Sequence, residues 1–274
     1  MMDTVEAALF EQHLDECTLA EGAIALNALV YPDINQTAFL QSLDAMFEEV
    51  EQALVHEIDQ KQKFESFLRF FYYNWRFQGD TERFFDSANS RMDLVLARRK
   101  GIPVSLGALL LYFGQRLGFP IEGVNFPSQF IIRINWYGEA PLFLNPFNGE
   151  YISKAILKAW LIGYDGPLAK LKSEHLAPCD NPSILGRWLA VMKGSLMHED
   201  NFARALDCSN IALSFVPDDP YEIRDRGFIF EKLDCQQQAA DDFQFFIDQC
   251  PEDPSSEVLK IHVGVLSSHT PVIH

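Results

Sequence analysis

Basic residues and cysteine pairs are scarce in this 274-residue sequence. Residues 1–60 contain 13 Asp and Glu but no Lys or Arg, and the whole chain carries a formal net charge of -17. Affinity for nucleic acid comes chiefly from accumulated Lys and Arg contacts with phosphates, so we expect no direct nucleic-acid partner. The five cysteines form no CxxC pair, which argues against a zinc ribbon or a disulfide framework and favours reduced thiols.

Long apolar runs are also missing. The longest uncharged one, LGALLLYFG at 106–114, is far too short to span a bilayer, and no basic residues precede the first apolar positions as they do in a secretory leader. With 48% hydrophobic and 13% aromatic residues, the chain can nevertheless bury a sizeable core. We therefore expect a cytoplasmic protein of two or three units, with no membrane partner.

Sequence motifs for nucleotide binding, zinc hydrolysis and serine catalysis are absent. The chain contains no GxxxxGK[ST], no GxGxxG after a strand, no HExxH and no GxSxG. Residues 57–174 contain neither histidine nor cysteine, whereas a metal site needs clustered His, Cys or carboxylate ligands. We expect no metal and no cofactor. The middle of the chain also lacks the usual general base and the usual thiol nucleophile.

The N-terminal part of the sequence shows helical periodicity. Apolar residues recur at spacings of three and four through 19–32 and 35–58, and a third helix is expected over 63–77. The middle then changes character: one helix ends before Gly101, which we expect to adopt the left-handed cap conformation, and another runs from Pro103 to Gly118. Strands are expected after it, over residues 121–126, 129–137 and 141–147.

A repeat occupies the last hundred residues. VPDDP at 216–220 recurs as CPEDP at 250–254, an offset of 34 residues, which is the tetratricopeptide period. Aligning the two turns superposes Ala205 on Ala239 as the small residue of the second helix of each repeat. We expect helical hairpins followed by one capping helix after Pro254.

The first repeat departs from the tetratricopeptide pattern at two positions. Lys193 stands where glycine is usual, and Ser209 stands where an aromatic residue is usual. The repeat as a whole is therefore a firmer prediction than any single position within it.

Four motifs, taken together, carry a family resemblance: GIPVSLG at 101–107, FPSQ at 126–129, NPFNGE at 145–150 and DPYEIRDRG at 219–227. The chain resembles, over essentially its whole length, the bacterial SirB family of transglutaminase-like proteins, especially its gammaproteobacterial members. The resemblance implies an α+β fold in three parts. These are a helical N-terminal segment (1–80), a papain-like transglutaminase-like core with an antiparallel sheet (81–174) and tetratricopeptide-like helical hairpins (175–274).

The resemblance also implies where a site would lie. Transglutaminase-like enzymes hold a cysteine at the N-terminus of a buried helix, a histidine on the next strand and an aspartate on the strand after it. The corresponding positions here are Pro103 or Ser105, then Gln129, then Asn145. Glutamine cannot act as a general base near neutral pH, and asparagine cannot stabilise an imidazolium by charge. The resemblance thus implies a degenerate triad region, which we predict to converge in one cleft.

Plainer interpretations of the same residues stay open. Ser105 can cap the start of its helix, Gln129 and Asn145 can hold two strands by hydrogen bonds, and Asn148 can form the turn after the third strand. As binding residues, Gln129, Asn145 and Asn148 would instead contact a ligand in the remnant cleft.

The functional hypothesis is a non-catalytic transglutaminase-like protein that acts as a protein-interaction or regulatory scaffold with a protein partner. The resemblance implies an indirect part in regulating virulence and invasion genes. One alternative is a hydrolase or acyltransferase with a rebuilt site, completed by Ser105, by His175 or His198, or by a C-terminal cysteine. Another is a small-ligand binding protein that uses the remnant cleft.

Overall fold

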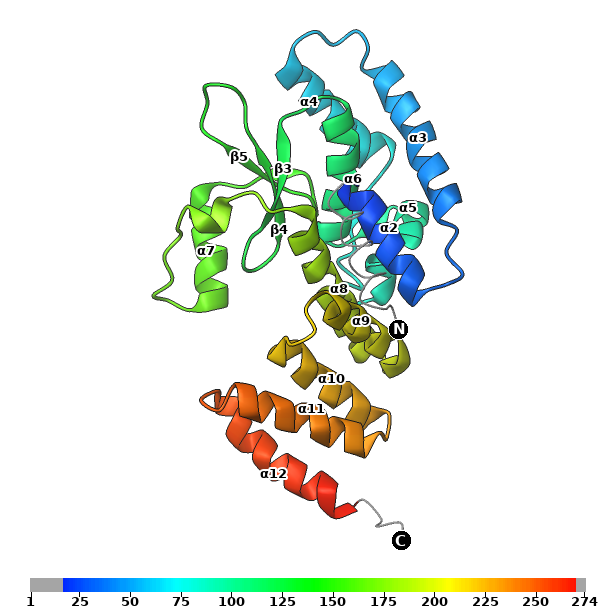
Figure 1. The fold of residues 1–274 in the computed structure, drawn as a ribbon. Coiled ribbons are helices and arrows are strands. Elements are labelled where there is room, and N and C mark those ends of the chain that lie inside the picture. The colour runs from blue at the N-terminus through cyan, green and yellow to red at the C-terminus, as the bar shows by residue number, and fades with distance from the viewer. Residues whose placement is uncertain (1–16, 270–274) are drawn as a thin grey trace. The chain divides into compact units, whose positions relative to one another are not determined.

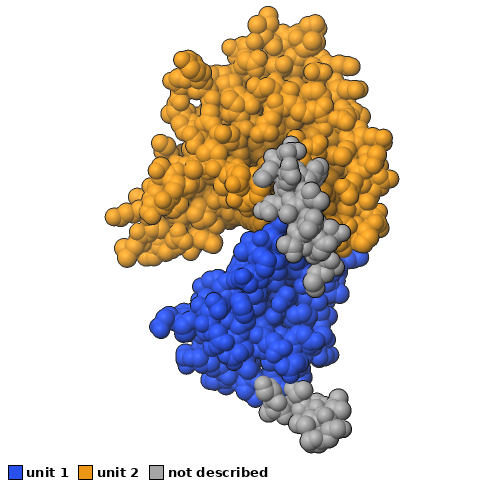
Figure 2. Space-filling view, viewed as in Figure 1, with its two compact units in different colours: residues 1–12, 189–274 blue, residues 13–188 orange. Residues whose placement is uncertain are grey.

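The computed structural model describes residues 17–269, which form two compact units. One unit comprises residues 17–188 and the other residues 189–269, drawn in orange and blue in Figure 2. The division lies inside helix α8 (Asn181–His198), later than the predicted boundary at 174/175. The predicted boundary at 80/81 falls inside the first unit, so the N-terminal helices and the sheet share one compact body.

Hydrogen bonds explain why the first unit extends past residue 175. The backbone N–H of Cys179 donates to the carbonyl of Gly123 at 2.9 Å. The indole N–H of the fully buried Trp188 donates to the carbonyl of Ser90 at 3.1 Å. Both bonds satisfy backbone carbonyls of the first unit, so the start of α8 belongs to its core.

Helices α2 (Leu19–Val30), α3 (Gln36–Ala53) and α4 (Gln60–Arg69) form the predicted N-terminal helices. The third one changes its pitch before it ends, because α4 continues into a π-helical turn, η1 (Phe70–Asn74). Such π-helical turns are rare in proteins, and those that do occur are often found at functional sites.

Two further helices follow, α5 (Met92–Arg98) and α6 (Pro103–Arg116), with short 3₁₀ turns elsewhere at η2 (Ser87–Asn89) and η3 (Glu174–Leu176). Pro103 occupies the first turn of α6 as predicted, where its missing N–H costs nothing. Beyond the end of α6, Gly118 has a φ of 82°, a conformation that glycine adopts easily.

The prediction for Gly101 was wrong. Arg99, with a φ of 58°, takes the left-handed position at the end of α5. Gly101 instead lies in strand β2 (Lys100–Gly101), which pairs in parallel with β1 (Gln78–Gly79). A Cβ at Gly101 would lie 2.5 Å from the Ser105 hydroxyl oxygen, so glycine is required there by close packing rather than by a cap.

The main sheet is antiparallel with the strand order β3-β4-β5-β6. Three strands match the predicted segments, and the fourth is a short strand that the sequence analysis did not predict. The bounds are β3 (Ile121–Asn125), β4 (Phe130–Ile134), β5 (Leu142–Asn145) and β6 (Glu150–Tyr151).

Helix α6 covers one face of the sheet. Gly107 and Gly114 allow this close packing, because a Cβ at either position would lie within 2.4 Å of the Phe130 ring or of the Ile121 side chain. The groups that approach these glycines are thus side chains of the strands.

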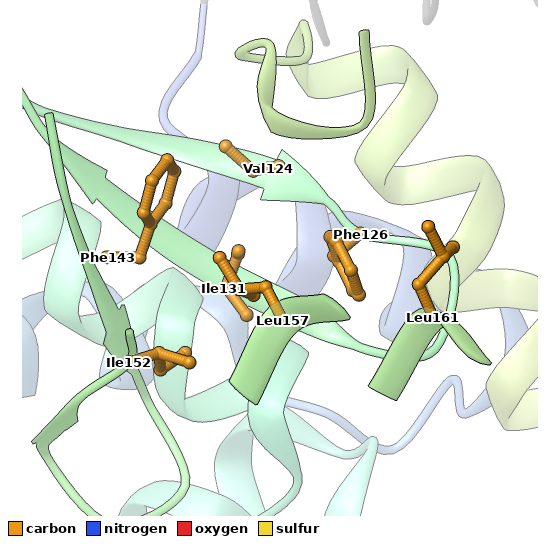
Figure 3. Close-up of a cluster of buried hydrophobic side chains, with 7 residues drawn as sticks. All are labelled: Val124, Phe126, Ile131, Phe143, Ile152, Leu157 and Leu161. Carbon is orange, nitrogen blue, oxygen red and sulfur yellow. The ribbon is translucent and has the colours of Figure 1, made fainter. Parts of the chain in front are cut away.

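Helix α7 (Lys154–Asp165), which the sequence analysis did not anticipate, covers the other face (Figure 1). Its two buried residues, Leu157 and Leu161, point into an apolar cluster on that side of the sheet (Figure 3). With apolar residues buried on both faces, β4 reads in the sequence as an almost continuous apolar run rather than as an alternating one. The other members of the cluster are Val124, Phe126, Ile131, Phe143 and Ile152.

The second unit consists of helices, as the repeat predicts, and no strand occurs between 186 and 250. After α8 come α9 (Phe202–Phe215), α10 (Pro220–Lys232), α11 (Gln236–Gln249) and the capping helix α12 (Pro254–His269). Ala205 and Ala239 are both fully buried. Burial of both residues is what equivalent packing positions in successive hairpins would require.

The two departures from the tetratricopeptide pattern meet in one buried polar cluster. The ammonium group of Lys193 lies 2.8 Å from the carboxylate of Glu222 and 3.0 Å from that of Asp225. The hydroxyl of Ser209 donates to the same Glu222 carboxylate at 2.6 Å. The side chains of Lys193 and Glu222 are only 7% and 15% exposed, so each offsets the cost of burying the other.

Candidate functional site

A cavity of about 450 Å³ lies where β5 ends and the loop before β4 meets α7. Gln129 and Asn145, two of the three residues predicted for the site, line this cavity together. The remaining lining residues are Ser128 from the loop and Ala159, Trp160, Gly163 and Tyr164 from α7. We call this cavity the Gln129 pocket.

Gln129 lies in the bend that directly precedes β4 and is half-buried. Within residues 17–269 its side-chain amide forms no hydrogen bond, so it does not tie two strands together. Asn145 ends β5, and its side-chain oxygen accepts a hydrogen bond from the backbone N–H of Phe147 at 3.0 Å. Its backbone carbonyl accepts from the N–H of Gly149 at 2.8 Å. Asn145 thus shapes the turn after β5, whereas the Gln129 amide is available to a ligand.

Ser105, the third residue of the predicted site, is not among the residues that line the Gln129 pocket. It is fully buried in the first turn of α6. Its hydroxyl oxygen accepts from the N–H of Ile102 at 3.0 Å, and its O–H donates to the carbonyl of the same residue at 3.1 Å. The structure therefore places Ser105 as a helix-start cap, and the expected convergence of all three residues in one cleft needs this correction.

This arrangement predicts that Ser105→Ala lowers the free energy of unfolding by about 1–3 kcal/mol, because the buried N–H of Ile102 loses its acceptor. The exposed Ser128 provides the matched control, since Ser128→Ala is expected to change that free energy by less than about 0.5 kcal/mol. Urea denaturation of both variants measures the difference. Equal, small effects would show that the Ser105 hydroxyl does not support the helix start.

Asn148, the third predicted binding residue, forms the turn between β5 and β6. Its side-chain N–H donates to the carboxylate of Glu150 at 2.6 Å, and its side-chain oxygen accepts from the N–H of that residue at 3.2 Å. Gly149 beside it has a φ of 75°. Asn148 lines a different cavity from Gln129 and Asn145, so the three predicted binding residues do not share one pocket.

The sequence analysis missed the aromatic side of the Gln129 pocket. Trp160 and Tyr164 occupy neighbouring turns of α7, and Tyr164 is 65% exposed. A signal for this helix was present, because Ser153 precedes apolar residues at helical spacing. In the structure the Ser153 hydroxyl caps α7 by accepting from the N–H of Ile156.

No histidine or cysteine is among the residues that line the Gln129 pocket. His175 accepts a hydrogen bond from the backbone N–H of Lys172 through Nδ1. Burial raises the pKa of the Cys208 thiol to about 12, which keeps it protonated near neutral pH. Nor do residues 17–269 place three or more His, Cys, Asp or Glu side chains where they could hold a metal ion.

The chemistry that the pocket offers is recognition. A glutamine amide presents two donors and one acceptor, and the adjacent aromatic rings present apolar surface. Proton transfer from a nucleophile would need a base within about 3 Å of it, and the pocket lining contains no imidazole, thiol or carboxylate. The lining thus combines the side-chain amides of Gln129 and Asn145 with the aromatic rings of Trp160 and Tyr164.

Two family models match this chain. Residues 37–190 match the transglutaminase-like superfamily, and residues 192–263 match the tetratricopeptide repeat. The first match covers more than half of the chain, and the transition between the two matches falls within α8. The protein is thus a transglutaminase-like protein with a tetratricopeptide-like second unit.

Curated relatives share this arrangement over almost their full length. A UPF0162 protein of Vibrio cholerae is 53% identical over 96% of this chain and 98% of its own. Protein SirB1 of Salmonella typhimurium is 34% identical over 97% of this chain and 99% of its own, and the UPF0162 protein YchA of Escherichia coli K12 matches to the same extent. No solved structure gives a significant match.

The chain therefore belongs to the family of SirB1 and the UPF0162 proteins, which confirms the resemblance found in the motifs. The combination of a transglutaminase-like domain with tetratricopeptide repeats supports an interaction role in general terms, because stacked repeats of this kind present extended binding surfaces. Among the helices of the described residues, none is both long enough and apolar enough to cross a membrane.

Proposed function

We propose that this protein is a non-catalytic member of its superfamily, in which the Gln129 pocket recognises part of a protein partner instead of transforming a substrate. The observation that carries the proposal is the pairing of Gln129 with Asn145 in a pocket that has no histidine, cysteine or carboxylate in its lining. Both residues retain hydrogen-bonding groups, but neither can perform the proton transfer of the histidine or the charge stabilisation of the aspartate.

Ser105 supports the same proposal. A serine hydroxyl becomes a nucleophile only beside a base that accepts its proton. Here the hydroxyl is fully buried and makes both of its hydrogen bonds with Ile102. A rebuilt catalytic site would have to break this cap and expose the hydroxyl before it could react.

Recognition by the pocket would combine two elements. The unpaired amide of Gln129 is suited to a peptide group or an amide side chain, since it can donate to a carbonyl and accept from an N–H at the same time. Trp160 and Tyr164 supply flat apolar surface beside it. The tetratricopeptide-like unit offers a second binding surface, and through such contacts the protein would exert a regulatory role indirectly.

The test is affinity capture from native lysate with the full-length protein as bait. Gln129→Ala is expected to reduce the captured partner at least fivefold relative to wild type, because an unpaired partner amide in a desolvated contact costs about 1–3 kcal/mol. Gln41→Ala on the exposed face of α3 is the matched control and should capture as wild type does. Equal capture by all three proteins would remove the Gln129 pocket from the recognition surface.

A further inference from the structure

A second cavity, of about 580 Å³, is lined in part by the turn that follows β5. Its walls come from α4 and the π-helical turn η1, from β1, and from residues 147–150. It shares no lining residue with the Gln129 pocket. We call it the Arg69 cavity, after the one basic residue that lines it.

Hydrogen bonds fix the walls of the Arg69 cavity. The hydroxyl of Tyr72 on η1 donates to the carbonyl of Pro146 at 2.8 Å. The backbone N–H of Gly79 on β1 donates to the carbonyl of Phe147 at 2.8 Å. These bonds join segments that lie far apart in the sequence, so the cavity is formed before any ligand arrives and a ligand would not need to order it.

Two glycines keep this space open. A Cβ at Gly79 would lie 2.3 Å from the ring of Phe147. A Cβ at Gly149 would lie 2.5 Å from the ring of Tyr72, and its φ of 75° is unfavourable for other residues as well. The rings of Phe147 and Tyr72 thus pack directly on the backbone of these glycines, and both rings line the cavity.

The charges in the lining are of both signs. Glu65 and Arg69 are one helical turn apart on α4, on the same face of the helix, and Glu150 lies on β6. Glu65 accepts a hydrogen bond from the hydroxyl of Tyr151. The guanidinium of Arg69 forms no ion pair and no hydrogen bond within the described residues, although a carboxylate lies one turn away on its own helix.

Other polar groups in the lining are unused as well. The side chains of Tyr73, Gln78 and Thr81 form no hydrogen bond within residues 17–269, and all three line the cavity. Tyr73 is 77% exposed on the π-helical turn. The cavity therefore offers a free cation, two carboxylates, neutral hydrogen-bonding groups and aromatic rings within a volume that suits a small ligand.

We propose that the Arg69 cavity binds a zwitterion, namely an α-amino acid or a short peptide with free ends and an aromatic or aliphatic side chain. Arg69 pairs with the ligand carboxylate, while Glu65 and Glu150 receive the ammonium group. The rings of Tyr72 and Phe147 contact the apolar side chain. A simple anion is disfavoured because two carboxylates line the cavity and the whole chain carries a net charge of -17.

Isothermal titration calorimetry with the full chain tests this assignment. The probes are phenylalanine, the tripeptide Gly-Gly-Phe, and the same tripeptide with an acetylated N-terminus and an amidated C-terminus. We expect saturable binding of at least one free-ended probe and at least tenfold weaker binding of the capped peptide, which has lost both charges. Comparing phenylalanine with Gly-Gly-Phe distinguishes a free amino acid from a peptide end.

Variants then locate the binding. Arg69→Gln should weaken the free-ended probe at least tenfold, whereas the exposed Arg83→Gln, outside the cavity lining, should bind as wild type does. Gln129→Ala should also bind as wild type does, so this proposal and the proposed function fail separately. The assignment is overturned if no probe binds at millimolar concentration, if the capped peptide binds equally well, or if Arg69→Gln has no effect.

Discussion

Lys193→Ala should lower the free energy of unfolding of the second unit by about 3–5 kcal/mol. The substitution removes the ammonium group that is paired with Glu222, whose side chain is 15% exposed, and it leaves that carboxylate largely buried without this direct ion-pair partner. The hydroxyl of Ser209 cannot neutralise it. Because this cluster joins α8, α9 and α10, the loss should loosen the first helical hairpin as a whole.

Two controls define the cause. Lys260 and Glu257 form an exposed ion pair, 2.6 Å apart, that solvent screens. Lys260→Ala should therefore lower the free energy of unfolding by less than about 1 kcal/mol. A triple variant, Lys193→Met with Ser209→Ala and Glu222→Leu, should recover most of the stability, because a buried polar cluster replaced by apolar residues of similar volume is often no less stable. Urea denaturation followed by far-ultraviolet circular dichroism measures all three; a triple variant as unstable as Lys193→Ala would contradict the electrostatic explanation.

Leu161→Ala should lower the free energy of unfolding of the first unit by about 3–5 kcal/mol, through lost burial and the cavity left behind. Leu161 is fully buried and is one of only two buried residues on α7 (Figure 3). Leu157 and Leu161 are thus the fully buried anchors of the helix that carries Trp160 and Tyr164. Removing the Leu161 side chain should therefore also lower the affinity of the Gln129 pocket for its ligand.

Tryptophan fluorescence during denaturation suits this measurement, because all four tryptophans occur at or before residue 188 and so report only on the first unit. Ile156→Ala on the same helix is the matched control. Its side chain is 44% exposed, so the substitution should lower the free energy of unfolding by less than about 1 kcal/mol. A loss of the same size in both variants would mean that α7 is not anchored through Leu161.

Periodicity and turn chemistry predicted much of the fold. The spacing of apolar residues in 19–32 and 35–58 predicted α2 and α3, and the offset of 34 residues between the two proline turns predicted the hairpins that contain Ala205 and Ala239. These features are local, so a single sequence reveals them.

What the sequence could not show depends on contacts between distant segments. Gly101 was assigned to a cap because the pattern of a basic turn followed by glycine is local, whereas its actual constraint is the Ser105 hydroxyl packed against it. In the sequence, Lys193 and Ser209 are only departures from the repeat pattern. In the structure both donate hydrogen bonds to Glu222, which lies on another helix. The Arg69 cavity has the same origin, since its walls come from α4, β1 and the turn after β5.

The candidate site was predicted in part. The family motifs identified Gln129 and Asn145, and the structure brings these two together in one pocket. Ser105 was assigned to the same cleft because the family resemblance aligns the start of α6 with the nucleophile region. Its burial and its two hydrogen bonds with Ile102 depend on the packing of the helix start, which the motif does not encode.

The central claim is that the Gln129 pocket recognises without catalysing, and intact-mass spectrometry tests it most directly. Wild type and Ser105→Ala are incubated with acyl-donor peptides and with a serine-reactive fluorophosphonate. We expect no covalent adduct on either protein and no product from the peptides, because the pocket lining contains no imidazole, thiol or carboxylate that could activate a nucleophile. An adduct or turnover that wild type shows and Ser105→Ala loses would contradict this claim and establish an enzyme with Ser105 as its nucleophile.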